Sequence, residues 1–434
     1  MEASPSSTAM PEAIPDPAGP DRLLNSNFLL LWMGQTISQL GNQAYGLAVM
    51  FWLMEKTGSA SLMGLLMTVA TVPGVVLAPF GGTFADRHSR IRIIIVCDLI
   101  SAATMLGLTA VIFLAPERLD LLVSLLFVAA AVMGVNRSFF QPAIVACFPD
   151  LVPREKLAAA NSLNQFSIQA SLFLGQAAGG VLYKLIGAPL LFLFDGLSFL
   201  VSAVSSMFIR LPETKRERPP AANWREVFRG FLRETGEGFH YVWQHRGMRD
   251  FLFSLSLINF LLMPVTVLMP FYVTQYLHKG SGWYGFLMSS ISVGAVAGFL
   301  AAGALQLRGA ARARGILASL FAIPTIFGTF CFFPIPVVAL IGAFLAGASV
   351  GFVNVQFAAM IQGSTPKELR GRVMGLLGTL SGGLIPIGLA LGGVAGDLTN
   401  KNVPLVYAIC AVLSVAVVIL GTMRRESREY LANG

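Results

Sequence analysis

The chain has 434 residues, of which 55% are hydrophobic and 12% are charged, and its formal net charge is +8. Soluble globular domains carry roughly 25% charged residues, so this composition excludes an ordinary water-soluble protein. It instead predicts an all-α polytopic membrane protein, because a segment in lipid must satisfy its own backbone hydrogen bonds.

Apolar stretches long enough to cross a bilayer recur along the whole chain. The twelve predicted transmembrane spans are 28–54, 61–85, 91–115, 121–147, 157–183, 187–210, 250–277, 282–306, 315–334, 336–361, 370–396 and 403–423. Gly187 divides the fifth span from the sixth, and the proline-containing turn at 333–336 divides the ninth from the tenth.

Lysine and arginine gather on alternate connections between these spans. The even-numbered connections and both tails hold most of the 30 basic residues, whereas the odd-numbered connections hold Lys56, Arg118, Lys184, Lys279 and Lys401. By the positive-inside rule the basic side is cytoplasmic, so we expect both termini in the cytoplasm. The net charge then reflects membrane topology, and we expect no nucleic-acid partner.

Two short sequence matches indicate a duplicated unit. Pro153-Arg-Glu and Pro366-Lys-Glu precede the fifth and eleventh spans, and Gly179-Gly-Val and Gly392-Gly-Val end them at the same separation. Such a duplication predicts two six-helix bundles. The predicted domains are a disordered cytoplasmic tail over 1–27, a bundle over 28–210, a cytoplasmic linker over 211–249, a second bundle over 250–423 and a cytoplasmic tail over 424–434.

The linker contains an amphipathic pattern. Its apolar residues recur at helical spacing, and a basic stripe runs beside them; the apolar members are Trp224, Val227, Phe228, Phe231 and Leu232, and the basic ones Arg225, Arg229 and Arg233. This pattern predicts a helix in the headgroup region of the inner leaflet. Its role is either a tether between the bundles or a regulatory element.

The loop between the second and third spans carries a recognisable motif. It reads Gly82-Thr-Phe-Ala-Asp-Arg-His-Ser-Arg-Ile-Arg92 and resembles the signature cytoplasmic loop of the major facilitator superfamily. Stretches that begin at Trp32, Glu55, Leu151, Met263, Leu369 and Pro386 resemble the branch containing bacterial macrolide-efflux proteins and enterobactin exporters. The resemblance implies the major facilitator fold, alternating access and a place in the bacterial inner (cytoplasmic) membrane.

The chain departs from the family loop at Ser89, where glycine is usual, and at Ile91, where a basic residue is common. The equivalent loop of the second half, around 303–314, has no acidic residue, which puts gating by that loop in doubt.

Four residues of the first loop are expected to act in gating: Gly82, Asp86, Arg87 and Arg90. Gly82 lacks a side chain and would allow another helix to approach closely. Asp86 lies at the membrane edge, where a helix terminus or an arginine could pair with it. Such pairing would hold the cytoplasmic ends of the bundles together in one conformation. For the arginines the alternative role is to anchor the topology.

Three ionisable residues fall inside predicted spans, where a charge costs roughly 2.5–3.5 kcal/mol on insertion scales. Asp98 and Arg137 lie at compatible depths from the cytoplasmic ends of their helices, so we predict an ion pair between them. Asp195 lies nearer the outer face without an evident cation. Asp195 and Asp98 are the candidates for proton coupling. For Asp195 the alternative is a carboxyl group hydrogen-bonded near the outer helix end.

Amide side chains form a stripe along the first span. An amide that faced lipid would leave its polar groups unsatisfied, so the stripe faces protein or a water-filled cavity. In the family that the chain resembles, spans 1, 4, 7 and 10 line the central cavity. The predicted substrate-binding residues are Gln35, Gln39, Asn42, Arg137, Gln141, Asn259, Tyr272, Asn354 and Gln356. For each of them, packing between helices is the alternative role.

Motifs for other chemistry are missing from the sequence. It contains no G-x-x-x-x-G-K-[ST], H-E-x-x-H or G-x-S-x-G stretch, so we expect neither ATP hydrolysis nor another enzyme activity. The four cysteines lie within or at the ends of spans without a C-x-x-C pair, and the four histidines form no clear cluster. We therefore predict no metal site and no cofactor.

These inferences together predict a secondary active transporter that exports an amphipathic small molecule, such as a macrolide-like drug, by alternating access and proton antiport. Its expected partners are the small-molecule substrate, protons and membrane lipids, and we expect a monomer. The alternatives are a siderophore exporter, a transporter that moves lysophospholipid between leaflets, and a non-transporting membrane sensor.

Overall fold

The structure is a computed structural model that describes residues 22–210, 224–330, 332–423 and 425–433. The described chain is helical, and strands are absent from it. Its helices are α1 (Ser26–Thr57), α2 (Ala60–Arg87), α3 (Arg90–Leu114), α4 (Leu119–Leu151), η1 (Arg154–Lys156), α5 (Leu157–Met207), α6 (Trp224–Gln244), α7 (Arg246–Phe271), η2 (Tyr272–Tyr276), α8 (Ser281–Leu305), α9 (Gly309–Thr329), α10 (Pro336–Ser364), α11 (Lys367–Leu398), α12 (Val403–Met423) and α13 (Arg425–Asn433).

Twelve membrane crossings follow from these helices. Ten helices among the described residues are long and apolar enough to span a bilayer. One of the ten covers 54 residues, which is about twice the length of a span, and α5 within it breaks at Gly187, where φ is +76°. α1 is not among the ten, since its amide residues lower its hydropathy, but at 32 residues it is long enough to cross. With α1 and both arms of α5 the chain crosses twelve times, as the sequence predicts.

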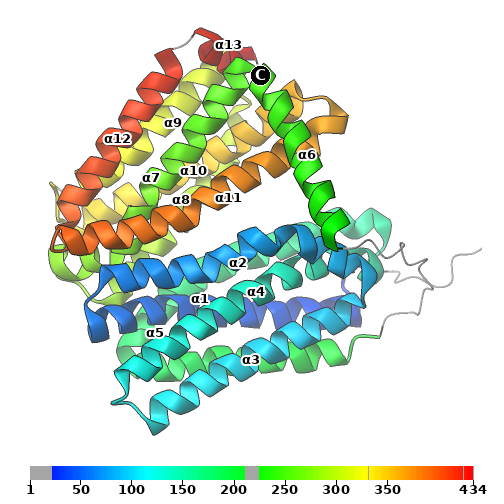
Figure 1. The fold of residues 1–434 in the computed structure, drawn as a ribbon, viewed down its shortest axis with the longest axis vertical. Helices are drawn as coiled ribbons and strands as arrows, with labels where there is room; N and C mark the ends of the chain where they lie inside the picture. Colours follow the sequence, from blue (N-terminus) through cyan, green and yellow to red (C-terminus); the bar gives the residue numbers. More distant parts are fainter. Residues whose placement is uncertain (1–21, 211–223, 331, 424, 434) are drawn as a thin grey trace, which may run out of the picture.

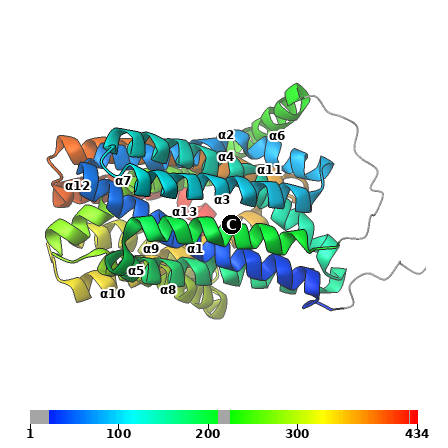
Figure 2. The same cartoon turned by 90° about the horizontal axis from the view of Figure 1, so that it is seen from below.

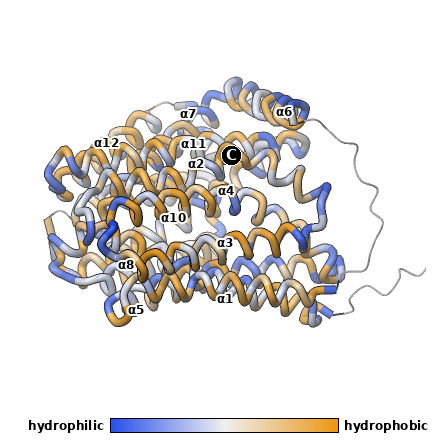
Figure 3. Tube along the Cα trace, turned by 60° about the horizontal axis from the view of Figure 1, so that its bottom comes forward, coloured by the Kyte–Doolittle hydropathy of each residue, from blue (hydrophilic) through white to orange (hydrophobic). Residues whose placement is uncertain are grey.

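The helices form two bundles that meet along two seams. Figure 1 shows α1–α5 together in one bundle and α7–α12 in the other. α2 of the first bundle packs against α11 of the second, and α5 packs against α8. Figure 2 shows the helices of both bundles running in roughly the same direction, as expected for a protein that crosses one bilayer repeatedly. Hydrophilic residues gather at the helix ends and along α6 (Figure 3).

The two ends of the molecule differ in how the bundles are joined. We call the end where α1 begins and α12 finishes the tail end, and the opposite end the far end. At the far end, one cluster of buried apolar residues includes Phe51 of α1, Leu268 of α7 and Tyr407 of α12, so both bundles share a core there.

At the tail end the core is divided. One cluster lies in the first bundle around Ile94 and Cys147, and a separate cluster lies in the second bundle around Phe251 and Phe357. Helices within a membrane associate mainly through van der Waals packing and interhelical hydrogen bonds. The bundles are therefore joined at the far end, and α2 and α11 diverge toward the tail end (Figure 1).

Two segments between and after the bundles are helical. α6 begins at Trp224 and ends at Gln244, in the part of the linker where the sequence predicts an amphipathic helix. The predicted C-terminal tail contains α13, which packs on α7 and α9 and buries Leu431. That segment is therefore a helix docked on the second bundle, since Leu431 is buried against α7 and α9. Most of the predicted N-terminal tail, residues 1–21, lies outside the described residues.

Candidate functional site

The far-end halves of α2 and α11 are in direct backbone contact. A Cβ atom on Gly64 of α2 would collide with the Leu389 carbonyl oxygen, and one on Gly393 of α11 would collide with the Ala60 carbonyl oxygen. Deeper in the membrane the Thr68 hydroxyl donates to the Pro386 carbonyl at 2.9 Å. Small residues that let backbones approach are a common basis of helix packing in membranes. They close the far end of this seam.

The carboxylate of Asp397, in the last turn of α11, caps the first turn of α2. It accepts hydrogen bonds from the Ser59 hydroxyl at 2.9 Å, the Ala60 amide at 3.0 Å and the Ser61 amide at 2.8 Å. The first amides of a helix have no partner within the helix and carry partial positive charge, so a carboxylate is a favourable cap. An acid of the second bundle thus satisfies the helix terminus of the first.

The α5–α8 seam is closed at the same end. The Ser281 hydroxyl, at the start of α8, donates to the Gly180 carbonyl at 2.8 Å. The Ser289 hydroxyl donates to the Phe173 carbonyl at 2.8 Å. Both seams therefore hold the bundles together over their far-end halves.

At the tail end, Gly82 and Asp86 do not make the close contacts predicted for a gate in this conformation. A Cβ atom on Gly82 would meet nothing within 4 Å, and Asp86 is exposed. The close helix approach expected at Gly82 occurs instead at Gly81, where a Cβ atom would collide with the Ser138 carbonyl of α4. Gly81 therefore packs within its own bundle, and the gating role of Gly82 stays a prediction for a conformation that is closed at the tail end.

Arg90 has a structural partner within the first bundle. Its guanidinium forms an ion pair with Asp150 at 2.9 Å and also donates to the Ala146 carbonyl, which ties the start of α3 to the end of α4. Arg87 is half-buried at the end of α2. Arg90 therefore stabilises the loop geometry from inside one bundle.

Asp98 lies in a buried polar cluster at the centre of the first bundle. It is 1% exposed, and its carboxylate accepts from the Ser202 hydroxyl at 2.7 Å and the Gln35 amide at 3.4 Å. The Gln35 amide also donates to Ser202 at 2.9 Å. The cluster joins α1, α3 and the second arm of α5.

The predicted ion pair between Asp98 and Arg137 is not formed among the described residues. Asn136, the neighbour of Arg137, takes the position on α4 that faces α3, and its amide donates to the Cys97 carbonyl and to the Ser101 hydroxyl at 2.7 Å. One residue along a helix turns the side chain by about 100°. Arg137 consequently points away from α3 and is exposed. The prediction matched the depths but not the helix faces.

Asp195, on the second arm of α5, is fully buried against α1. Its exposed fraction is 0%, and within the described part of the chain neither carboxyl oxygen has a hydrogen-bond partner. It lies over Gly41 of α1, where a Cβ atom would come within 2.9 Å of its Oδ1 atom. The helix-end hydrogen bond considered as an alternative is therefore not present in this conformation.

The predicted substrate-binding residues divide into two groups. The first group is exposed or half-buried and comprises Gln39, Asn42, Arg137, Gln141, Asn259 and Asn354. α4 shows why such positions are candidates for a polar pathway: Val128 and Val135 are exposed on one face, and Arg137 and Gln141 on another. A guanidinium is costly against lipid, so the polar face is the one that borders the interior.

The second group is buried inside single bundles and comprises Gln35, Tyr272 and Gln356. Gln35 binds Asp98 and Ser202, as described above. Tyr272 stacks on Phe330 at a ring distance of 5.4 Å, and the Gln356 amide donates to the Ala302 carbonyl at 3.5 Å. These three residues pack helices together within a bundle in this conformation. The sequence could not show this, because helical spacing does not say which neighbouring helix a face meets.

Sequence reasoning missed three buried serines of the first bundle, which lie on the same helix face as the predicted Asp195. Asp195, Ser198, Ser202 and Ser206 follow one another at i, i+3, i+7 and i+11, and all four are buried. That spacing was a detectable signal of one polar helix face. Asp397 was missed as well, although an acid at the end of an apolar span is itself unusual. Among the described residues, no group of His, Cys, Asp or Glu could hold a metal ion.

Comparison with known proteins identifies the family. The sequence profile described as Major Facilitator Superfamily matches residues 31–389 and 284–432, which together cover most of the chain. The chain belongs to the major facilitator superfamily. Members of this superfamily are transporters, so the chain is a multi-pass membrane transporter and not an enzyme.

Relatives of this major facilitator chain include drug exporters. Macrolide efflux protein A of Streptococcus pyogenes is 25% identical over 93% of the chain and 96% of its own length. Multidrug efflux pump Tap of Mycolicibacterium fortuitum is 24% identical over 91% of the chain and 94% of its own length.

Solved structures support the same fold. The nucleoside transporter NupG aligns with a TM-score of 0.71 at 12% identity, covering 92% of the chain and 99% of NupG. A bacterial homologue of the iron transporter ferroportin, 19% identical, gives 0.69 in its inward-facing state, covering 93% of the chain and all of the homologue. The outward-facing state of that homologue gives 0.54, with 92% of the chain and 99% of the homologue covered. Each of these alignments shows that the fold is shared.

Proposed function

We propose that this major facilitator transporter exports an amphipathic small molecule of the macrolide or multidrug class, by alternating access and in exchange for protons. Full-length similarity to macrolide and multidrug efflux proteins supports the substrate class. The observation that carries the mechanism is the asymmetry of the two ends, with both seams closed at the far end and separate cores at the tail end.

The tail end is the cytoplasmic end in this proposal. It carries the start of α1, the end of α12 and most of the lysine and arginine residues, as the positive-inside rule requires of a cytoplasmic face. The described conformation is then the one that accepts substrate from the cytoplasm or the inner leaflet. Export requires the bundles to rock so that the far-end seams open.

Substrate contacts are assigned to the exposed polar positions of the central helices. Asn42 of α1, Arg137 and Gln141 of α4, and Asn354 of α10 are exposed in this conformation. Gln39 and Asn259 are half-buried and complete the set. A small number of polar groups in an apolar setting fixes the orientation of an amphipathic ligand.

Proton coupling is assigned to the carboxyl groups inside the first bundle. A buried charge is costly unless it is paired, and among the described residues the oxygens of Asp195 have no hydrogen-bond partner. Asp195 therefore fits a carboxyl group that holds a proton in this conformation. Asp98 is the second candidate, since it accepts a hydrogen bond from Ser202, which lies on the same arm of α5 as Asp195.

Transport by the purified protein in liposomes tests the proposal. We expect a radiolabelled macrolide to accumulate in proteoliposomes with an acidic interior, several-fold above protein-free liposomes, and a protonophore to abolish the accumulation. Equal flux with and without the pH gradient would contradict proton coupling. Macrolide binding without any flux would contradict export and favour a sensor.

A further inference from the structure

The linker helix α6 carries a stripe of large apolar side chains that remain exposed. Phe228, Leu232, Phe239 and Trp243 lie on one side of the helix and are 41%, 52%, 41% and 52% exposed. We call these four residues the α6 stripe. Soluble surfaces seldom expose several large apolar side chains together, and such a patch indicates a binding surface.

A different face of α6 packs on the second bundle. Gly238 lies against the Arg372 carbonyl of α11, and Val242 is 2% exposed. Glu237 forms an ion pair with Arg372, and the Tyr241 hydroxyl donates to the Ser364 carbonyl at 3.3 Å. The contacts that hold α6 on α10 and α11 therefore do not use the α6 stripe.

The α6 stripe continues into apolar surfaces of spanning helices at both of its ends. The Trp243 ring meets the Phe253 ring of α7 edge-on at 6.5 Å, and Phe253 is itself 40% exposed. At the other end, the Phe228 ring stacks on the Phe80 ring of α2 at 6.4 Å. Figures 1 and 2 show α6 at the margin of the molecule beside α2 and α11. The stripe is thus level with the ends of helices that face lipid.

Basic groups flank the stripe. Arg229 and Arg233 are exposed on α6, and Arg233 reaches Glu237 only at 3.8 Å with its side chain 76% exposed. The Arg249 guanidinium lies over the Trp243 ring at 5.1 Å. Arginine side chains are attracted to the phosphates of anionic lipids, and an apolar helix face can insert between their acyl chains. The two features together fit an anionic leaflet.

We propose that α6 is a membrane-surface helix that binds anionic phospholipid of the tail-end leaflet, with the α6 stripe between the acyl chains and Arg229 and Arg233 on the phosphates. This inference requires only that the chain spans a bilayer, and it is independent of what the transporter carries.

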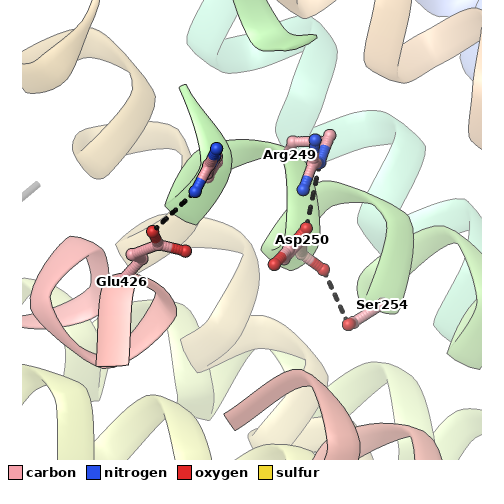
Figure 4. A network of polar contacts seen from close by, with 5 residues as sticks. Arg249, Asp250, Ser254 and Glu426 are labelled. Atoms are coloured by element: carbon pink, nitrogen blue, oxygen red, sulfur yellow. Dashed lines mark hydrogen bonds and ion pairs between the residues drawn. The ribbon is translucent and has the colours of Figure 1, made fainter. Parts of the chain in front are cut away.

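The junction of α6 with α7 transmits this binding to the second bundle. Arg249 pairs with Asp250 at 3.0 Å, Arg246 pairs with Glu426 of α13 at 3.4 Å, and the Ser254 hydroxyl donates to the Asp250 carbonyl at 2.7 Å. Figure 4 shows this network at the start of α7. α6 therefore moves with the second bundle, and it touches α2 of the first bundle, where the Phe228 ring stacks on the Phe80 ring. Lipid bound to α6 consequently acts on the tilt of the second bundle.

Hydrogen exchange of the full-length protein in lipid nanodiscs tests the proposal. One sample contains phosphatidylcholine alone, and the other contains seven parts phosphatidylcholine to three parts phosphatidylglycerol. Each arginine near an anionic surface strengthens binding about fivefold. With Arg229 and Arg233 both on the phosphates, we expect amides of 225–243 to exchange about 25-fold more slowly with phosphatidylglycerol. The double variant Arg229→Gln/Arg233→Gln should lose this difference, and Leu232→Ser/Phe239→Ser should exchange faster in both lipids.

The control variant is Arg154→Gln/Lys156→Gln, which removes two exposed basic residues of η1 at the tail end, away from α6. It should keep the full difference between the two lipids. Equal exchange of α6 in both lipids would overturn the proposal. Loss of the difference in the control variant would also overturn it, because the effect would then come from overall charge.

Discussion

At the scale of single residues, the first bundle buries two carboxyl groups among its own helices, which is costly for a charged side chain. Asp98 is held by Ser202 and Gln35, whereas Asp195 lies over Gly41 without a hydrogen-bond partner among the described residues. The two acids have the same side chain but different surroundings. Their surroundings favour Asp195 over Asp98 for proton exchange and give Asp98 a structural role in fixing helices as well.

Replacing Asp195 by asparagine tests the coupling role. Asparagine keeps the shape of the side chain but cannot release a proton, so macrolide accumulation driven by a pH gradient should fall at least about tenfold. Downhill exchange of labelled for unlabelled macrolide should continue, because it needs no net proton movement. Both are measured in proteoliposomes. The control is Asp120→Asn, an exposed acid of α4. Gradient-driven accumulation that survives in Asp195→Asn would end the coupling assignment.

Replacing Ser202 by alanine tests the structural role of the Asp98 cluster. The variant removes a buried donor to a carboxylate, which destabilises a protein by about 1–3 kcal/mol. We expect a lower thermal unfolding temperature for the purified protein in detergent. Ser162→Ala is the matched control in the same helix, since that exposed hydroxyl bonds only to the Ala158 carbonyl of α5. An equal effect of the two variants would contradict the importance of the cluster.

At the scale of elements, α2 and α11 form an antiparallel pair that is joined at one end. Asp397, at the end of α11, caps the start of α2, and the pair separates toward Asp86, at the end of α2. Each helix therefore ends in an acid near the level at which the other begins. In this conformation the far-end acid is engaged and the tail-end acid is exposed.

Removing the Asp397 carboxylate should weaken the far-end closure. A lost helix cap costs about 0.5–2 kcal/mol, so Asp397→Ala should shift the balance toward far-end-open molecules by about 2- to 30-fold. The measurement is spin-label distance distribution between α2 and α11 at the far end. The effect should be absent in Asp120→Asn, whose carboxyl lies in the first turn of α4 within one bundle. An unchanged distribution in Asp397→Ala would show that the glycine contacts alone hold the seam.

At the scale of the whole molecule, two bundles share one core at the far end and keep separate cores at the tail end. Interconversion must therefore break a packed interface at one end while building another at the other end. Packed interfaces of this kind have discrete arrangements and not a continuous range. Covalent closure of the far end should thus trap the described state.

A disulfide across the α5–α8 seam provides that test. In Phe173→Cys/Ser289→Cys the two positions are already in contact, so oxidation should stop transport nearly completely and reduction should restore it. Transport is followed in proteoliposomes as above. The control is Ser290→Cys/Leu340→Cys, which joins α8 to α10 within one bundle. Transport that continues after complete far-end crosslinking would contradict alternating access.

The sequence by itself determined the membrane class, the family and the twelve crossings, because lipid forces every crossing to be an apolar helix of similar length. It also marked Asp98, Arg137 and Asp195, since charges in apolar spans stand out from their surroundings. Such features are local in the chain and can be found by composition and periodicity alone.

Which helix faces meet was decided only by the tertiary structure. Asn136 and not Arg137 faces α3, Gly81 and not Gly82 makes the close approach, and Tyr272 packs inside its bundle. Asp397 caps a helix whose first turn lies more than 300 positions away in the chain. These outcomes depend on the rotation and tilt of neighbouring helices, which are set by packing between distant segments and leave no periodic signal in either segment.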